Sequence, residues 1–427
     1  MRTLIKDATI LTMSDKGVIG SGYLVIEGSK IVAVEAGDAP NQNFDQVIDG
    51  EGFLLIPGLI NTHTHAAMIL LRGYADDMPL MEWLHEKIFP FEEKLTAEHI
   101  YWGTKLAIIE MVKSGTTCFA DMYFFMDRVA EAVLESGMRA VLARGLSSFS
   151  PPDALDECRA LYRDYQQAGD GRIKIWVSPH APYTCTPEFL QKCIALAKEL
   201  NTGIHIHVSE TLAEQHEIKD KYGKTPTAHL ESLGLFEVPV LAAHGVHLNA
   251  EDIQVFRKYN ASVAHNPESN MKLASGVAPV TSMLEAGVNV SLGTDGASSN
   301  NDLSLLLEMR MAAFLQKLHN MDATALPAHT ALEMATVNGA KALGWEQEIG
   351  KLAAGYQADL VMVKATSANM TPLFNPMSNL AYSASNEDVE SVMVAGRCLL
   401  QNRNILPYSE QETIDEIRRL IRDINKT

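Results

Sequence analysis

The stretch that decides the fold is LIPGLINTHTH, residues 55–65, an apolar run that ends in two histidines separated by one residue. Seven further apolar runs follow it, and most are succeeded by a stretch with the spacing of an amphipathic helix. They are TCFADMYF (117–124), RAVLARGL (139–146), IKIWVSPHAPY (173–183), GIHIHVSE (203–210), VLAAHGVHL (240–248), SVAHNPES (262–269) and NVSLGTDG (289–296). Eight such units predict a closed, TIM-like (β/α)8 barrel better than an open doubly wound sheet.

The two ends of the chain predict a second unit. Residues 1–56 alternate short apolar stretches with Gly, Asp and Asn, as short antiparallel strands do, and strand-like runs return after the barrel. We therefore expect an α/β protein whose barrel, residues 57–349, is inserted in a small discontinuous β-sandwich domain made of residues 1–56 plus 350–427. A capping box at Ser409–Glu412 and an apolar stripe predict a surface helix at the C-terminal end.

Composition excludes several classes of partner. The 427 residues carry a formal net charge of −18, which repels polyanions, and no basic run interleaved with aromatics marks a nucleic-acid groove. The five cysteines are scattered without a C-x-x-C pair, so we expect neither disulfides nor a thiolate zinc site, and a cytoplasmic location. No uncharged apolar run approaches the roughly 18 to 20 residues that cross a bilayer, so we expect no membrane contact.

Ligand-type side chains gather at the strand ends. A period-two strand directs His63 and His65 to one side, into the barrel mouth, although an isolated pair is equally often structural. The later strands end in the same kinds of residue, where barrel enzymes place their active sites. These are His180, His205, His207, Glu210, His244, His247, His265 and Asp295. Imidazoles with one carboxylate suit hydrolytic zinc chemistry, so we expect a metal site, with Glu210 as a proton shuttle rather than a structural ion-pair partner.

The segments around these strand ends follow a known pattern. They are PGLINTHTHAAMILLRGYADDMPLMEWL (57–84), ARGL (143–146), SPHAPY (178–183), HIHVSE (205–210), LAAHGVHL (241–248), AHNPESNMKLASGVAPV (264–280) and LGTDGASSNNDLSLLLEMR (292–310). On them the chain resembles the amidohydrolase superfamily, its cytosine deaminase-like branch, and most closely the 5-methylthioadenosine/S-adenosylhomocysteine deaminases. The resemblance covers nearly the whole chain.

The resemblance implies one divalent metal ion, with zinc as the first choice. It places the ion on His63, His65, His207 and Asp295, and leaves His205 in a supporting role. Binuclear relatives carry a carboxylated lysine or a glutamate at the fourth strand, where this chain has SPHAPY. A single metal is therefore expected.

The resemblance also implies hydrolytic deamination of an adenine nucleoside to the inosine analogue plus ammonia. Asp295 takes a proton from the attacking water, Glu210 delivers one to ring N1, and His244 stabilises the oxyanion or orients the water. The residues expected to bind substrate are Glu92, Arg144, His180, Glu210 and Asp295. For Glu92, an exposed surface position is almost as good an interpretation of the sequence alone.

The expected substrate is a small nucleoside. The loop after residues 139–146 carries no arginine before Arg159 to pair an amino-acid carboxylate, so we expect 5′-methylthioadenosine to be preferred, with S-adenosylhomocysteine and adenosine as further candidates. The alternatives are a guanine or pterin deaminase or a triazine chlorohydrolase of the same branch. A metal-free barrel serving as an interaction protein is disfavoured, because all four ligand residues are present; a homo-oligomer stays open.

Overall fold

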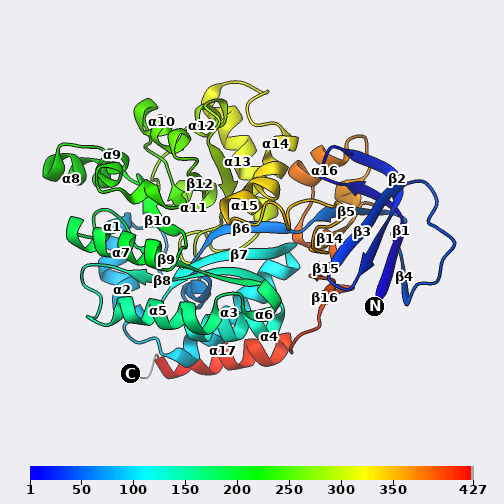
Figure 1. Ribbon diagram of the computed structural model, residues 1–427, viewed down its shortest axis with the longest axis horizontal. Coiled ribbons are helices and arrows are strands. Elements are labelled where there is room, and N and C mark those ends of the chain that lie inside the picture. Colours follow the sequence, from blue (N-terminus) through cyan, green and yellow to red (C-terminus); the bar gives the residue numbers. More distant parts are fainter. Residues whose placement is uncertain (425–427) are drawn as a thin grey trace.

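A computed structural model describes residues 1–424 as a parallel barrel beside a separate β-sheet (Figure 1). The barrel strands follow one another in chain order around the sheet. They are β6 (Leu59–Thr64), β7 (Thr116–Tyr123), β8 (Arg139–Leu146), β9 (Ile173–Pro179), β10 (Ile204–Val208), β11 (Val240–His244), β12 (Ser262–His265) and β13 (Asn289–Leu292). A parallel bridge between Thr64 and Asp295 joins the last strand to the first, which confirms the predicted barrel class.

Helices surround the barrel (Figure 1), and the longer ones have buried residues along one face. In α4, Val129, Ala130 and Val133 are buried, and the helix ends at Gly137 in the left-handed region (φ 83°). The helical segments up to the last barrel strand are η1 (Ala66–Leu71), α1 (Leu80–Trp83), η2 (Leu84–Ile88), α2 (Phe89–Glu92), α3 (Ala97–Lys113), α4 (Met126–Ser136), α5 (Ala154–Tyr165), α6 (Ala168–Gly171), α7 (Pro187–Glu199), α8 (Leu212–Tyr222), α9 (Pro226–Ser232), η3 (Leu235–Glu237), α10 (Ala250–Lys258), α11 (Pro267–Lys272) and α12 (Val280–Glu285).

Three helices follow the barrel strands: α13 (Leu305–Asn320), α14 (Ala328–Met334) and α15 (Val337–Ala342). They cover much of the two stretches that follow the eighth strand-like run with helical spacing, DLSLLLEMRMAAFLQKLHN (302–320) and HTALEMATVNGAKALG (329–344). None of the helices in residues 1–424 is long and apolar enough to span a membrane.

The second sheet combines strands from both ends of the chain. Its strand order is β17-β16-β15-β14-β5-β1-β2-β3, with β4 paired to β1. Strand β5, from the N-terminal part, pairs antiparallel with β14 from the C-terminal part, so neither part forms the sheet alone. The strands are β1 (Arg2–Leu11), β2 (Val18–Glu27), β3 (Lys30–Ala36), β4 (Gln46–Asp49), β5 (Phe53–Pro57), β14 (Leu360–Lys364), β15 (Val389–Val394), β16 (Arg397–Gln401) and β17 (Asn404–Ile405). The domain boundaries at 56/57 and 349/350 stay a prediction.

The expectation of antiparallel pairing in residues 1–56 is wrong for two pairs. Strands β1, β2 and β3 form antiparallel hairpins, but β1 pairs parallel with β4 and with β5. The hairpins are local, whereas the loop 37–45 carries the chain back across the sheet before β4. A local alternation of apolar residues does not encode that return.

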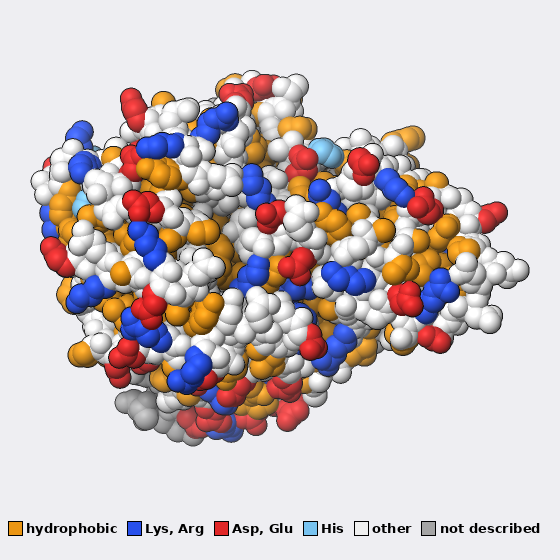
Figure 2. All heavy atoms as spheres, viewed as in Figure 1, with side chains coloured by type: hydrophobic (Ala, Val, Ile, Leu, Met, Phe, Trp, Pro, Cys, Tyr) orange, Lys and Arg blue, Asp and Glu red, His pale blue; other side chains and the backbone are white. Residues whose placement is uncertain are grey.

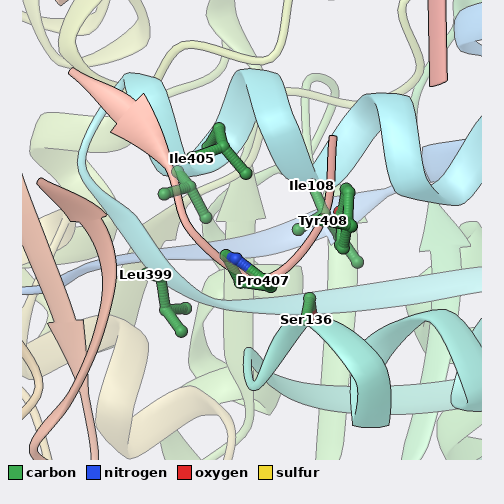
Figure 3. Close-up of a pocket in the computed structure, with 7 residues that line it drawn as sticks. Ile108, Ser136, Leu399, Ile405, Pro407 and Tyr408 are labelled. Atoms are coloured by element: carbon green, nitrogen blue, oxygen red, sulfur yellow. The ribbon is translucent and has the colours of Figure 1, made fainter. Parts of the chain in front are cut away.

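The C-terminal segment returns to the barrel. Helix α17 (Glu410–Ile424) lies along α3 (Figure 1), where Lys113 Nζ bonds Glu410 Oε1 at 2.7 Å. The connecting chain packs on α3 through Tyr408, whose hydroxyl donates to the Lys105 carbonyl at 3.0 Å. Figure 3 shows the gap at this junction, about 10 Å³ beside Ile108, which holds a single water at most. Residues 425–427 of the predicted C-terminal part lie outside the described residues.

Two short helical segments complete this part of the chain, η4 (Ala368–Met370) and η5 (Asn386–Asp388), together with α16 (Pro376–Tyr382). They lie between β14 and β15 in sequence, and α16 packs against α13 and α14.

A buried ion pair links the barrel to the second sheet. Arg139 of β8 donates from Nε to Asp359 Oδ2 at 2.9 Å, and Asp359 Oδ1 accepts the Ala395 N–H at 2.6 Å. Arg139 and Asp359 are 1% and 2% exposed. The guanidinium also lies 5.2 Å from the Trp345 ring centroid.

We expect Arg139→Ala to lower the free energy of unfolding by about 3–5 kcal/mol, because it leaves the Asp359 carboxylate buried and unpaired. Denaturation in urea measures the change. Lys198→Ala is the control, since Lys198 and Glu237 form an exposed pair for which a loss of about 1 kcal/mol or less is expected. An equally small fall in the free energy of unfolding in both variants would contradict the linking role of Arg139.

Candidate active site

A cavity of about 550 Å³ opens at the carboxyl ends of the barrel strands. One wall comes from the strand ends, and a second, largely apolar wall comes from the segment that contains α1, η2 and α2. The apolar wall includes Leu80, Trp83, Leu84, Ile88 and Phe89, and Phe149 lies on the same cavity from the loop after β8. The polar residues that line it include His65, Glu92, Arg144, His180, His207, Glu210, His244 and Asp295.

The four predicted metal ligands converge at the base of this cavity. One ligand atom from each of His63, His65, His207 and Asp295 lies within 4.8 Å of the others. Asp295 Oδ1 is 3.3 Å from His63 Nε2 and 3.2 Å from His65 Nε2, and His65 Nε2 is 3.3 Å from His207 Nε2. Three imidazole nitrogens and one carboxylate oxygen therefore face one point.

The other ring nitrogen of each histidine is already bonded, which fixes the ring so that Nε2 faces the cluster. Buried His63 Nε2 has no hydrogen-bond partner within residues 1–424, which is unfavourable unless something else satisfies it. This donor set fits a divalent cation of the zinc type. The hydrogen bonds of these second ring nitrogens are His63 Nδ1 with His205 Nε2 (2.9 Å), His65 Nδ1 with the Met122 carbonyl (2.7 Å) and His207 Nδ1 with the His180 carbonyl (2.7 Å).

Asp295 is held from behind. Its Oδ2 accepts bonds from Ser269 Oγ at 2.7 Å and Ser299 Oγ at 2.8 Å, which leaves Oδ1 for the cluster. The residue has φ 62°, in the left-handed region, so the chain turns sharply where it leaves the barrel. Gly293, just before it, permits this approach, because a Cβ there would lie 2.7 Å from the Cβ of His63.

Burial and the mutual charges shift the pKa values of the cluster. Burial lowers the pKa of His63 to about 3. For His65, burial acts in the same direction but is outweighed by Asp295 and the Met122 carbonyl, which raise its pKa to about 9. Burial opposes ionisation of Asp295, yet the neighbouring rings of His63 and His65 hold the pKa of Asp295 well below the usual range. The site thus favours a carboxylate beside positive charge.

Glu210 and His244 face each other next to the cluster. His244 Nε2 lies 3.8 Å from Glu210 Oε2, and His244 Nδ1 bonds Asn270 Oδ1 at 2.9 Å. Glu210 is 6% exposed, and burial raises its pKa. A raised pKa makes it easier for this carboxyl group to carry a proton that it can pass on.

The five residues expected to bind substrate, Glu92, Arg144, His180, Glu210 and Asp295, all line the cavity. Glu92 is partly buried and accepts a 2.5 Å bond from the Tyr123 hydroxyl, and burial raises the pKa of Glu92 despite that bond. His180 Nδ1 lies 3.0 Å from Thr184 Oγ1, and burial lowers the pKa of His180 to about 4.

Arg144 also reaches the cavity, but its charge is already paired. Its Nε donates to Glu157 Oε2 at 2.6 Å, and Nη1 donates to the Gly145 carbonyl. Glu157 belongs to α5, which follows the loop after β8. The guanidinium therefore faces the cavity with its positive charge partly neutralised by Glu157.

Two strand-end histidines serve elsewhere. His247 Nε2 bonds the Ser275 carbonyl at 2.7 Å, so it fixes a loop. His265 is fully buried at the end of β12, and burial lowers its pKa to about 3. Neither belongs to the cluster of ligand atoms.

Sequence reasoning missed the groups that hold the ligands in place. Asp121 Oδ1, at the end of β7, accepts bonds from Thr64 Oγ1 (2.8 Å) and the Ala66 N–H (2.6 Å), and so fixes the strand end between the first two histidines. Its place at a strand end was a usable signal. Ser269 and Ser299 carried no such signal, because short hydroxyl side chains are common in loops.

Comparison with known proteins places the chain in a family. Residues 54–399 match the amidohydrolase family. A 5-methylthioadenosine/S-adenosylhomocysteine deaminase of Syntrophomonas wolfei is 54% identical over 428 residues, 99% of each chain. A zinc-bound adenosine deaminase of Xanthomonas campestris has a TM-score of 0.95 and 35% identity, covering 100% of this chain and 99% of its own. A zinc complex of an atrazine chlorohydrolase from Arthrobacter aurescens has a TM-score of 0.92 and 25% identity, covering 98% and 100%.

These similarities extend over both the barrel and the shared sheet, and the four clustered donors lie where the strands of such a barrel end. By its sequence over nearly the full length, the chain belongs to the amidohydrolase family and, within it, to the family of 5-methylthioadenosine/S-adenosylhomocysteine deaminases.

Proposed function

We propose that this protein removes the 6-amino group of an adenine nucleoside by hydrolysis, yielding the inosine analogue and ammonia. The preferred substrate is 5′-methylthioadenosine, and S-adenosylhomocysteine and adenosine are further candidates. The observation that carries this proposal is the buried His63–His65–His207–Asp295 cluster beside Glu210 in a nucleoside-sized cavity. The name of the Syntrophomonas wolfei relative supports the choice of substrate.

The cofactor in this proposal is one zinc ion, held by His63, His65, His207 and Asp295. Such an ion, when bound, supplies the Lewis acidity that makes water a nucleophile at neutral pH. The unsatisfied Nε2 of His63 and the bonded outer nitrogens of the histidines support this assignment.

The proton transfers are assigned to side chains next to the cluster. Asp295 accepts a proton from the attacking water, and Glu210 delivers one to purine N1 as water adds to C6. His244 keeps its Nδ1 on Asn270, so its Nε2 faces the oxygen that adds to C6 and stabilises the developing charge or orients the water. The amino group then takes the proton held by Asp295 and leaves C6 as ammonia, while the C6 hydroxyl returns a proton to Glu210, and the hypoxanthine ring remains.

The remaining polar residues are assigned to the sugar. The Glu92 carboxylate accepts bonds from the ribose hydroxyls, His180 bonds N3 or the sugar, and Arg144 lies toward the 5′ group. The apolar wall around Trp83 and Phe149 suits an uncharged methylthio substituent. Because this wall excludes water, the polar contacts at the base of the cavity become stronger.

We also infer a cytoplasmic location and no nucleic-acid or membrane partner. The five cysteines are free, as in a reducing compartment, and on the face in Figure 2 basic side chains are interspersed with acidic ones. A homo-oligomer stays a prediction.

We expect purified, metal-replete protein to convert 5′-methylthioadenosine to its inosine analogue, visible as the ultraviolet change from adenine to hypoxanthine. Glu210→Gln and Asp295→Asn should each lower kcat by about 100- to 10,000-fold, because each removes a group that transfers a proton. Turnover of guanine or a triazine with none of any adenine nucleoside would replace the proposal by the alternative activities. Full activity in either variant would refute the proton-transfer role of that residue.

We expect about one metal ion per chain by elemental analysis, with activity lost on chelation and restored by zinc. His207→Ala should lose metal, because it removes one of four ligands. His247→Ala is the matched control, since that histidine bonds the Ser275 carbonyl outside the cluster and its variant should keep its metal. Undiminished metal content in His207→Ala would contradict the ligand assignment.

We expect kcat/KM for 5′-methylthioadenosine to exceed that for S-adenosylhomocysteine by about tenfold or more, an energy difference of about 1.4 kcal/mol. The reason is that Glu157 already pairs Arg144, so an incoming carboxylate meets little free positive charge. Glu157→Gln should narrow this ratio of efficiencies. Glu199→Gln, which removes one of the two carboxylates that pair the exposed Arg159, should leave it unchanged. Equal efficiencies on both substrates in the unmodified protein would disprove the preference.

A further inference from the structure

Glu214 is a buried carboxylate, 3% exposed, to which the proposed reaction assigns no task. Its Oε1 accepts the backbone N–H of Ser209 at 2.9 Å, and its Oε2 accepts the backbone N–H of Glu210 at 2.8 Å. The two bonds clamp two consecutive amides immediately after β10. One of these amides belongs to the residue assigned as the proton shuttle.

This clamp differs from an ordinary helix cap. Glu214 is the third residue of α8, whose N-cap is Thr211, and an acid at that position usually bonds the amide of its own N-cap residue. Asp252 of α10 does so, accepting the Asn249 N–H at 3.2 Å. Glu214 instead reaches past the N-cap to the turn that precedes the helix, so its bonds serve that turn.

The turn needs such support. Ser209 has φ 56°, in the left-handed region that residues with a Cβ rarely adopt, and its buried amide requires a partner. The carbonyl side of the same residue is held by the His247 N–H at 2.9 Å. Together the two contacts fix the direction in which the chain leaves β10.

The carboxylate of Glu210 has no equivalent support of its own. Within residues 1–424 it accepts no hydrogen bond, and it lies 3.8 Å from His244 Nε2. Its place in the cavity therefore follows from the backbone at Ser209 and Glu210. We propose that Glu214 is the positioning residue of Glu210, acting through these two backbone amides to hold the shuttle within reach of the purine. The proposal rests on the deaminase function proposed above.

Glu214→Gln tests the proposal with little change of side-chain volume. Gln has one acceptor oxygen and would set an NH2 group against the second amide, so the turn should loosen. We expect kcat to fall about 100-fold with KM changed less than about twofold, since a displacement near 1 Å at a reacting group has an effect of that size. Metal content should remain that of the unmodified protein.

Asp252→Asn is the matched control, because it makes the same kind of change at the same position of a helix, in the next strand-and-helix unit, without touching the shuttle. We expect its kcat to stay within about twofold of the unmodified protein. A fall in kcat of Asp252→Asn as large as that of Glu214→Gln would show a general effect of helix caps and overturn the proposal.

A double-mutant cycle separates positioning from support of the fold. If Glu214 acts through Glu210, the Glu210→Gln/Glu214→Gln protein should be about as active as Glu210→Gln alone. If the fold-losses of activity of the two single variants multiply in the double variant, the proposal is overturned. If Glu214→Gln fails to fold, Glu214→Asp takes its place, and failure of both to fold would show a purely structural role.

The experiment distinguishes this inference from the function on which it rests. Inactivity of the unmodified protein on every adenine nucleoside would remove the proposed function. An active unmodified protein, an inactive Glu210→Gln and a fully active Glu214→Gln would overturn the positioning role alone.

Discussion

The backbone hydrogen bond from the Asp295 N–H to the His63 carbonyl, 2.9 Å long, joins the last barrel strand to the first. The side-chain amide of Asn61 reinforces this seam, the line along which the first and last barrel strands meet. It donates a hydrogen bond to Thr294 Oγ1 at 2.7 Å and accepts one from the Thr294 N–H at 3.0 Å. Gly293 leaves room for the approach. Because this seam sets the carboxylate of Asp295 beside the imidazoles of β6, the cluster of three imidazoles and one carboxylate forms only in the closed barrel. An open sheet of the same strands would separate its two halves.

Around the cluster, the structure follows from the need to satisfy buried polar groups. Each imidazole that faces the cluster has its second nitrogen bonded by a residue from another strand-and-helix unit of the barrel. The second oxygen of Asp295 accepts bonds from two serines. The same logic holds for His244, whose Nδ1 is bonded to Asn270. Preorganised groups of this kind do not reorganise when charge develops, and a low dielectric makes their effect on the reaction larger.

The cavity brings this polar base together with an apolar wall from the segment that follows β6 and η1. The segment from α1 to α2 contributes both Trp83 and Glu92, so one stretch of chain supplies contacts for the substituent and for the sugar of a nucleoside. Its conformation includes a π-helical turn at Leu84–Ile88, a form that recurs at functional sites. The sequence left Glu92 undecided between surface and site, because nothing local shows whether this segment folds over the barrel mouth or away from it.

The sequence by itself determined the barrel and the gathering of ligand-type side chains at its mouth, because apolar runs that end in such residues bring those ends together wherever parallel strands close into a barrel. The choice of His63, His65, His207 and Asp295 as metal ligands came from the resemblance to a known family. It also determined that both chain ends contribute strands outside the barrel. Only the tertiary structure decided that β1 pairs parallel with β4 and β5, that Glu157 balances Arg144, and that Glu214 clamps the turn before α8. In each of these pairs, packing and turn geometry decide which groups meet. The periodicity of a single segment carries no information about its partner.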